Sequence, residues 1–209
     1  GVFRKFKLRG FKRGKVMKNK LMIVVRPHGV GKTHLTDYIR DNLESCNLYR
    51  LSGHADKTAN GLKYSQKMYE AFFNYLESMA FVPVTILLDS FFMTEELLAR
   101  LGEKDYSFTE DYYAFLERLN ALEYEIYYIE LYLENTDHYQ KRIQSRKHHN
   151  YFPISAEKSV KEQKGYDEIT KEVEAYSNIH VIRLAMDDYD KAYEMLSQEL
   201  KLGDKDENA

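Results

Sequence analysis

The chain contains five short apolar runs, and in the segments between them apolar residues recur every three or four positions. Runs of four to eight apolar residues between polar ones are typical of strands buried in a parallel sheet. Strands that alternate with helices pack as a parallel sheet with helices on both faces. The pattern therefore predicts one three-layer α/β domain, with strands at residues 21–25, 48–51, 84–88, 126–133 and 179–184.

The periodic stretches predict the helices of this domain. Two more helices are expected after the third strand, and Thr94 and Thr109 are suitable N-cap residues for them. The polar segment 52–61 contains two glycines and is predicted to be a loop. The other helices are expected at residues 32–45 and 62–79, from Thr136 to about 147, from Ser155 to about Tyr176, and around Ala192, Leu196 and Leu200.

Composition excludes two classes of protein. The chain has 209 residues, of which 44% are hydrophobic and 31% are charged, so disorder is not its main state. No apolar run reaches the ~18 residues that a membrane helix needs, so no membrane partner is expected. The single cysteine, Cys46, is expected within a helix and cannot form an internal disulfide. We therefore predict a cytoplasmic protein.

The charge is unevenly distributed, although the whole chain carries only −2. Residues 1–16 contain seven Lys and Arg residues and no acid. We interpret them as a flexible basic leader or a remnant of expression, ahead of a domain over 17–202 and an acidic tail over 203–209. The alternative is a basic arm that contacts nucleic acid or an anionic membrane surface, which we favour less.

The segment Arg26-Pro-His-Gly-Val-Gly-Lys-Thr33 follows the first strand and opens the first predicted helix. Apart from its first position, it matches the phosphate-binding loop G-x-x-x-x-G-K-[ST] in that context. Gly29 and Gly31 let backbone amides wrap around a phosphate chain, Lys32 reaches the β- and γ-phosphates, and Thr33 ligates Mg²⁺. The residues expected to contact ATP are His28, Gly29, Val30, Gly31, Lys32, Thr33 and His34.

Two further features suit phosphate chemistry. Asp89 ends the third strand, where α/β sheets bind ligands, and is expected to hold Mg²⁺ through water or to orient an acceptor oxygen. The alternative is that Asp89 caps the next helix. Arg142 and Arg146 lie four residues apart and are expected on one face of a lid helix that closes on phosphates. The alternative is a solvated charged face.

In these features the chain resembles the thymidylate kinase family and its deoxynucleotide kinase relatives, from about Met17 to Leu200. Besides the phosphate loop, the similar segments are Asp89-Ser-Phe-Phe-Met-Thr-Glu95 and Glu130-Leu-Tyr-Leu-Glu, the latter followed by Arg142-Ile-Gln-Ser-Arg146. The long helix with Tyr166 then precedes a last strand and a last helix. The resemblance implies a P-loop NTPase fold with five parallel strands in the order 2-3-1-4-5.

The resemblance also implies an activity, which is transfer of the γ-phosphate of ATP to a nucleoside monophosphate with Mg²⁺. Asp89 would then lie beside the acceptor, while Arg142 and Arg146 would neutralise phosphate charge from the lid. The helix with Phe72 would wall the acceptor pocket, although the spacing of its aromatic residues equally suits the core. Family members usually form dimers, so a homodimer is one expected assembly.

Two positions depart from the family's pattern. Ser90 stands where the family has the arginine that grips the acceptor phosphate, and we expect Arg100 to take over that role. Arg26 replaces the first glycine of the loop and is expected to keep a negative φ. We therefore favour a nucleotide kinase. The alternatives are a kinase of deoxynucleosides or polynucleotide 5′ ends, and a degenerate protein that binds nucleotides without phosphoryl transfer.

Overall fold

The computed structural model of the chain describes residues 17–31, 33–145 and 155–201, without the side chains of Thr33 and His34. The predictions for the two ends of the chain, Lys32 and Arg146 therefore lie outside the described residues. The strands are β1 (Asn19–Val25), β2 (Cys46–Tyr49), β3 (Thr85–Asp89), β4 (Tyr124–Tyr132) and β5 (Ile179–Ala185). The helices are α2 (Thr33–Asn42), α3 (Ala59–Met79), α4 (Phe92–Arg100), α5 (Thr109–Asn120), α6 (His138–Gln144), α7 (Ala156–Val173) and α8 (Tyr189–Leu200).

The five strands form one parallel sheet in the order β2-β3-β1-β4-β5, as the resemblance implied. The first strand lies in the centre, where Leu21 is level with Ile86 of β3 and Ile126 of β4. Both β1 and β3 have neighbours on each side, so their apolar runs are continuous. Because every strand runs the same way, the carboxyl ends of all five meet at one edge of the sheet.

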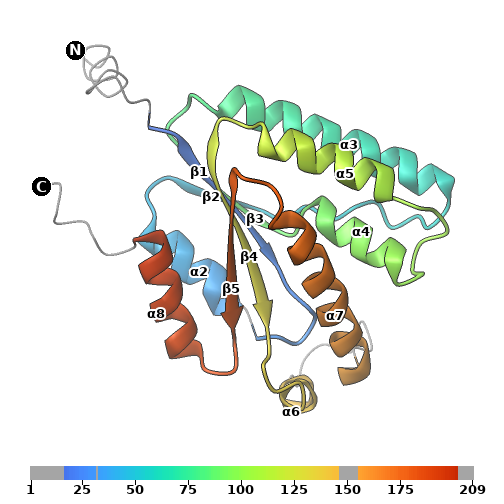
Figure 1. The fold of residues 1–209 in the computed structure, drawn as a ribbon, viewed down its shortest axis with the longest axis vertical. Helices are drawn as coiled ribbons and strands as arrows, with labels where there is room; N and C mark the ends of the chain where they lie inside the picture. The colour runs from blue at the N-terminus through green and yellow to red at the C-terminus, as the bar shows by residue number, and fades with distance from the viewer. Residues whose placement is uncertain (1–16, 32, 146–154, 202–209) are drawn as a thin grey trace, which may run out of the picture.

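Helices cover both faces of the sheet, and Figure 1 shows α3, α4, α5 and α7 on one side with α2 and α8 on the other. Side chains of β1 alternate between these two layers, as the period of a strand requires. Leu21 and Ile23 join the core beneath the four-helix layer, and Met22 and Val24 join the core beneath the other layer.

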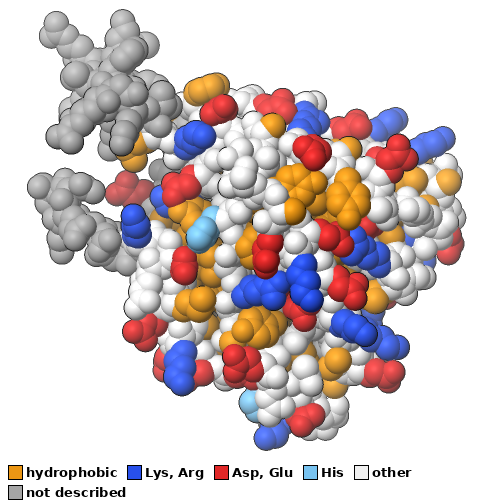
Figure 2. Space-filling view, viewed as in Figure 1, with side chains coloured by type: hydrophobic (Ala, Val, Ile, Leu, Met, Phe, Trp, Pro, Cys, Tyr) orange, Lys and Arg blue, Asp and Glu red, His pale blue; other side chains and the backbone are white. Residues whose placement is uncertain are grey.

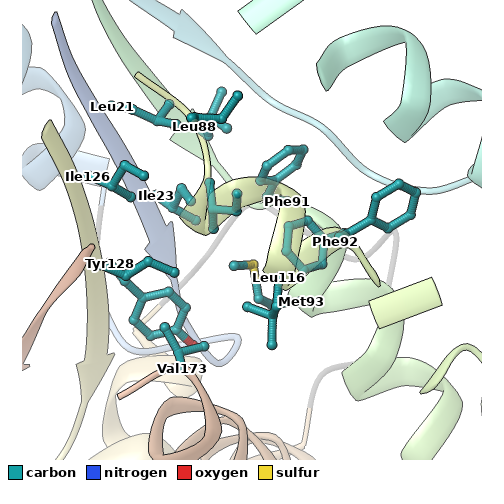
Figure 3. Packing of buried hydrophobic residues seen from close by; sticks show 14 of the residues in the cluster. Leu21, Ile23, Leu88, Phe91, Phe92, Met93, Leu116, Ile126, Tyr128 and Val173 are labelled. Carbon is teal, nitrogen blue, oxygen red and sulfur yellow. The ribbon is translucent and has the colours of Figure 1, made fainter. Parts of the chain in front are cut away.

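The larger core is built largely from aromatic rings. Phe91 and Phe92, which follow β3, lie with ring centroids 4.8 Å apart, and Phe73 of α3 stacks on Phe115 of α5 at 5.4 Å. Figure 3 shows how the chain brings Phe91 and Phe92 beside residues of β3 and α5, among them Leu116. This packing fixes the start of α4, and with it the segment that follows Asp89.

The second strand begins at Cys46 and ends at Tyr49, whereas the sequence predicted it at residues 48–51. The first helix ends at Asn42 and Ser45 has a φ of 52°, so the chain turns early and pairs Cys46 with Thr85 of β3. The expectation that Cys46 lies in a helix is therefore wrong. Burial raises the pKa of its thiol to about 11, which fits the absence of any sign of activation in the sequence.

Three of the predicted caps are also wrong. The N-cap residues are Phe91 for α4, Phe108 for α5 and Asp137 for α6, so the threonines at 94, 109 and 136 cap none of these helices. Thr94 instead bonds Ser90 and Tyr166, and Thr109 donates to Glu96. The prediction for Ser155 is confirmed, since its hydroxyl accepts a hydrogen bond from the amide of Lys158 at 3.1 Å.

The surface is strongly charged and mixed in sign. Figure 2 shows acidic and basic side chains interspersed over the face that carries α7 and α8. Among the described residues, none of the helices combines the length and the apolar character needed to cross a membrane.

Candidate active site

The loop after β1 has the backbone shape that phosphate binding requires. Gly29 and Gly31 both have a φ of +82°, a region that side chains disfavour. A Cβ at Gly31 would collide with the hydroxyl of Tyr189, and one at Gly29 would lie 3.0 Å from Ile143. Both positions therefore need glycine, for conformation and for space. Arg26 keeps a negative φ, as predicted.

Helix α7 holds this loop in place through His28. The buried carboxylate of Glu162 accepts hydrogen bonds from the His28 amide at 3.2 Å, and it lies 2.9 Å from Nδ1 of the same residue. The hydroxyl of Ser159 donates to the carbonyl of His28 at 2.5 Å. Because the His28 main chain is fixed on both sides, the loop is organised before any ligand arrives.

Arg142 braces the same loop from α6. Its guanidinium donates to the carbonyl of Val30 at 2.6 Å and to the carbonyl of Met186 at 2.7 Å. It also lies over the ring of Tyr189, 4.8 Å from the centroid. The structure thus brings Arg142 against the loop after β1. Its expected action on phosphates stays a prediction.

Asp89 lies at the carboxyl end of β3 and is almost fully buried. Arg26 grips it with two parallel hydrogen bonds, Nε to Oδ1 and Nη2 to Oδ2, both 3.0 Å long. Arg50, which follows β2, places its Nε 3.4 Å from Oδ2. The alternative that Asp89 caps α4 is therefore wrong, since the N-cap of that helix is Phe91 and no side chain caps it.

A cavity of about 400 Å³ opens beside this cluster. Such a volume falls in the usual range of small-molecule sites. Three cationic side chains reach it from the loop after β1, the end of β2 and the segment after α4. The residues that line it are Val24, Val25, Arg26, His28, Arg50, Ser52, Gly53, His54, Ala55, Asp89, Ser90, Thr94, Glu95, Leu98, Lys104, Glu162 and Tyr166.

Ser90, where the family has an arginine, lines the cavity in an unusual backbone conformation. Its φ is 84°, its amide donates to the carbonyl of Val24, and its hydroxyl donates to Thr94 at 2.8 Å. Thr94 in turn lies 3.0 Å from the hydroxyl of buried Tyr166. This chain of hydroxyl groups ties β3, α4 and α7 together at the floor of the cavity.

Two predicted acceptor residues do not reach the cavity. Phe72 packs edge-on against the rings of Tyr49 and Phe91, so it belongs to the core that its spacing equally suited. Arg100 donates two hydrogen bonds to Glu172 and one to Glu96, the latter at 3.1 Å. Because these two carboxylates hold its guanidinium, Arg100 does not replace the missing family arginine. Arg26 and Arg50 line the cavity beside Asp89.

Sequence reasoning missed the far end of the cavity. Glu95, Lys104 and Gly53 meet there, although each was part of a helix or loop without an assigned role. The available signal was an acidic pair, Glu95 and Glu96, on a helix that is otherwise apolar around its first turns. Both carboxylates are fully buried, which is rare unless they have specific partners.

The described residues do not fit a metal ion held by protein ligands. Both oxygens of Asp89 face arginine donors, and two guanidinium groups would repel a cation there. Within the described ranges, no group of three or more His, Cys, Asp or Glu residues is placed to hold a metal. We therefore assign no metal to Asp89, and the expected role of Thr33 stays a prediction.

The chain matches no protein-family model, and no curated protein matches its sequence. Several solved structures share its fold. Thymidylate kinase from Candida albicans superposes with a TM-score of 0.59 at 10% identity, over 88% of this chain and 92% of that one. The YorR protein from Bacillus subtilis, solved with phosphorylated GDP, gives 0.57 at 15%, over 87% and 95%.

Deoxyadenosine kinase from M. mycoides, solved with dATP, gives a TM-score of 0.54 at 14% identity, over 87% of this chain and 98% of that one. Identities this low show a shared fold alone. The strand order and the glycine loop after β1 agree with that fold. The chain therefore has the P-loop fold of the thymidylate and deoxynucleotide kinases.

Proposed function

We propose that the chain transfers the γ-phosphate of ATP to a nucleoside monophosphate. One observation carries this proposal: Arg26 belongs to both halves of the site. It is the first residue of the glycine loop, and it lines the cavity where it grips Asp89. A polyphosphate on the loop and an acceptor in the cavity would therefore meet beside this guanidinium, as in-line transfer requires.

The donor side of the site is the loop itself. Its positive-φ glycines direct backbone amides toward a bound anion, and the N-terminus of α2 adds positive potential. We assign Lys32 to the β- and γ-phosphates, and Arg142 and Arg146 to charge neutralisation. Phosphoryl transfer needs little more than such positioning and neutralisation.

The acceptor side favours a phosphate group over a bare nucleoside. Arg26, Arg50 and Lys104 all line the cavity, and the side chain of Arg50 is 69% exposed and free to turn toward a ligand. Arginine binds phosphate oxygens in the same two-pronged way as it binds a carboxylate. An acceptor phosphate would therefore take Arg26 and Arg50 as its partners, and would leave Asp89 beside the attacking oxygen.

The structural neighbours support the reaction class, since they include a thymidylate kinase and a deoxyadenosine kinase. The decisive test is ADP release from MgATP in the presence of each nucleoside, each nucleoside monophosphate and a DNA strand with a 5′-hydroxyl end. We expect release above the ATPase background with monophosphates. Release with the 5′-hydroxyl strand alone would favour the polynucleotide kinase alternative instead.

A second candidate function is nucleotide binding without transfer. The observation that favours it is the saturation of Asp89, whose two oxygens both accept from Arg26. If no acceptor displaces that arginine, the carboxylate stays neutralised. This candidate predicts that ATP binds by calorimetry while the whole acceptor panel leaves ADP release at background.

A further inference from the structure

The far end of the cavity holds a buried charged group that the proposed transfer does not use. Glu95 lines the cavity and is only 1% exposed. Its Oε1 accepts the hydroxyl of Tyr106 and lies 3.8 Å from Nζ of Lys104. Both of these contacts use Oε1, whereas Oε2 lies next to Gly53. A carboxylate therefore lies at the cavity wall with accepting capacity left over.

The surrounding loop is shaped around this carboxylate. A Cβ on Gly53 would collide with the Glu95 carboxylate and would lie 2.9 Å from Oγ of Ser65. The next residue, His54, donates its amide to Ser65 at 2.9 Å and accepts from Lys104 at 2.8 Å. Glycine at position 53 thus lets the loop lie directly against Glu95, and hydrogen bonds to Ser65 of α3 and to Lys104 hold the loop there.

The two charges at this end are unusual because both are buried. The side chain of Lys104 is 7% exposed and that of Glu95 is 1% exposed. Burying such a pair costs free energy that their attraction does not fully return, unless further hydrogen bonds complete it. Burial and the Glu95 carboxylate raise the pKa of Tyr106, so its hydroxyl stays a donor. A ligand that supplies donors to Glu95 and an acceptor to Lys104 would complete the set.

We propose, on the basis of the proposed function, that this end of the cavity recognises the guanine base of the acceptor. The Watson–Crick edge of guanine presents two adjacent donors, N1–H and the N2 amino group, followed by the O6 acceptor. The donors match Glu95, and O6 matches the ammonium of Lys104. Leu98 and Tyr166 line the same cavity and supply less polar surface for the faces of the ring.

The other bases match this wall less well. The N3–H of thymine or uracil is flanked by two carbonyl oxygens, at least one of which would face the carboxylate. Adenine and cytosine each offer one amino group next to a ring nitrogen acceptor, so only one donor reaches Glu95. A buried carboxylate that faces an acceptor receives no hydrogen bond to offset the cost of its burial. Such sites therefore discriminate strongly between ligands.

The first experiment measures binding and turnover in parallel with the wild-type chain. Calorimetry uses the 5′-monophosphates of guanosine, adenosine, cytidine, uridine and xanthosine, in ribose and deoxyribose forms, and ADP release is followed with the same set. We expect guanine to bind at least ~10-fold more tightly than the others. Equal affinities, or no binding at all, would overturn the inference. Guanine-selective binding without ADP release would overturn the proposed transfer and leave the base site standing.

The second experiment exchanges the specificity. In xanthine a carbonyl replaces the N2 amino group, and Glu95→Gln replaces one acceptor of the carboxylate with an amide donor. We expect E95Q to bind the xanthine nucleotide more tightly than the guanine nucleotide. The ratio of the two affinities should be about as large as the ratio by which wild type prefers guanine to xanthine. A merely structural glutamate would instead lose affinity for both equally, and that result would overturn the inference.

The matched control is Glu96→Gln. Glu96 is equally buried on the same helix, but its carboxylate binds Arg100 and Thr109 away from the cavity. E96Q removes the same charge and is expected to keep the guanine preference of wild type. Should E95Q fail to fold, the wild-type panel still decides, because an adenine or uracil preference there contradicts the proposal by itself.

Discussion

Arg26 and Asp89 lie 63 residues apart in sequence and form a two-pronged ion pair, with both hydrogen bonds 3.0 Å long. The arginine occupies the first position of the phosphate loop, where the motif has glycine. The side chain of Asp89 is 4% exposed and that of Arg26 is 22% exposed. The pair therefore joins β1 to β3 at the edge of the sheet where the cavity opens.

Restoring the glycine tests what this pair does. Arg26→Gly removes both of these hydrogen bonds from the buried carboxylate, while the largely exposed Arg50 stays 3.4 Å away. We expect a loss of about 1–3 kcal/mol in the free energy of unfolding, because a buried charge loses two charge-assisted hydrogen bonds. Urea denaturation followed by circular dichroism measures this loss.

The same variant separates the two candidate functions. For an active kinase, R26G lowers kcat/KM for the monophosphate acceptor, because a phosphate ligand disappears. For a degenerate binder, R26G removes the two hydrogen bonds that neutralise Asp89, and ADP release rises above the wild-type background. Arg50→Ala is the control, with an expected stability loss below about 1 kcal/mol, because the Arg50 side chain is itself largely exposed to solvent. A stability loss in R50A as large as in R26G would contradict this account of the pair.

The lysine of the loop gives the second prediction. Lys32→Met keeps the length of the side chain and removes the charge that the motif places on the β- and γ-phosphates. We expect at least a ~100-fold loss of kcat, since a charge that acts on the transferring phosphoryl group is lost. An unchanged thermal midpoint in calorimetry would show that folding is intact. Full activity in K32M would remove Lys32 from the mechanism.

The glycines of the site give a third prediction with an internal control. Gly31→Ala suffers twice, from a φ of +82° and from the collision with the hydroxyl of Tyr189. Gly102→Ala has a similar φ of +76° but no atom within 4 Å of the new Cβ. We expect G102A to cost about 1 kcal/mol of stability and G31A to cost clearly more. Equal costs would show that contact with Tyr189 is unimportant.

Nucleotide binding should separate these two variants even more sharply. We expect G31A to lose ATP affinity by at least tenfold, because the loop must shift, and G102A to keep it. Isothermal titration with ATP measures both. Loss of ATP affinity in G102A would point to an indirect effect of folding.

The sequence determined the sheet because the relevant signals are local. Each buried strand is a continuous apolar run, and the motif from Gly29 to Thr33 locates the first strand-to-helix turn without further context. The errors fall where long-range contacts decide. The second strand shifted by two residues because pairing with β3 fixes its register. Thr94 looked like a cap, but its partner Tyr166 is 72 residues away.

The site was predictable to the same extent. Asp89 was singled out because it ends a strand, Ser90 because the family has an arginine there, and the loop because of its motif. The role of Arg26 could not be read from sequence, since its partner lies on another strand. Arg100 was wrongly expected at the acceptor because nothing in the sequence reveals that Glu172 binds it. Glu95 was overlooked because a glutamate on a helix is ordinarily solvated.

The last prediction concerns a buried carboxyl group away from the cavity. Glu130 of β4 is fully buried, and its oxygens have no hydrogen-bond partner among the described residues. Nε of Arg183 lies 3.7 Å from Oε1. Burial, together with the nearby carboxyl of Asp167, raises the pKa of Glu130 to about 8. The folded protein therefore keeps a proton that the unfolded chain loses near pH 4.5.

This proton makes stability depend on pH with a definite sign. The contribution of Glu130 is fully present below pH 4.5 and is lost as the pH rises through about 8, because the folded state binds more protons in that window. We expect Glu130→Gln, which cannot ionise, to gain stability relative to wild type across this range, by roughly 1.4 kcal/mol per pKa unit at most. Urea denaturation at half-unit steps from pH 4.5 to 9 gives the difference between the two chains, in which the titration of distant carboxylates cancels. If the stability curves of the two chains stay parallel over this range, Glu130 ionises normally. A second variant, Asp167→Asn in the wild-type chain, removes the neighbouring negative charge and should lower the pKa of Glu130 in the folded state. The pH at which the loss of stability is complete should then be lower than in wild type.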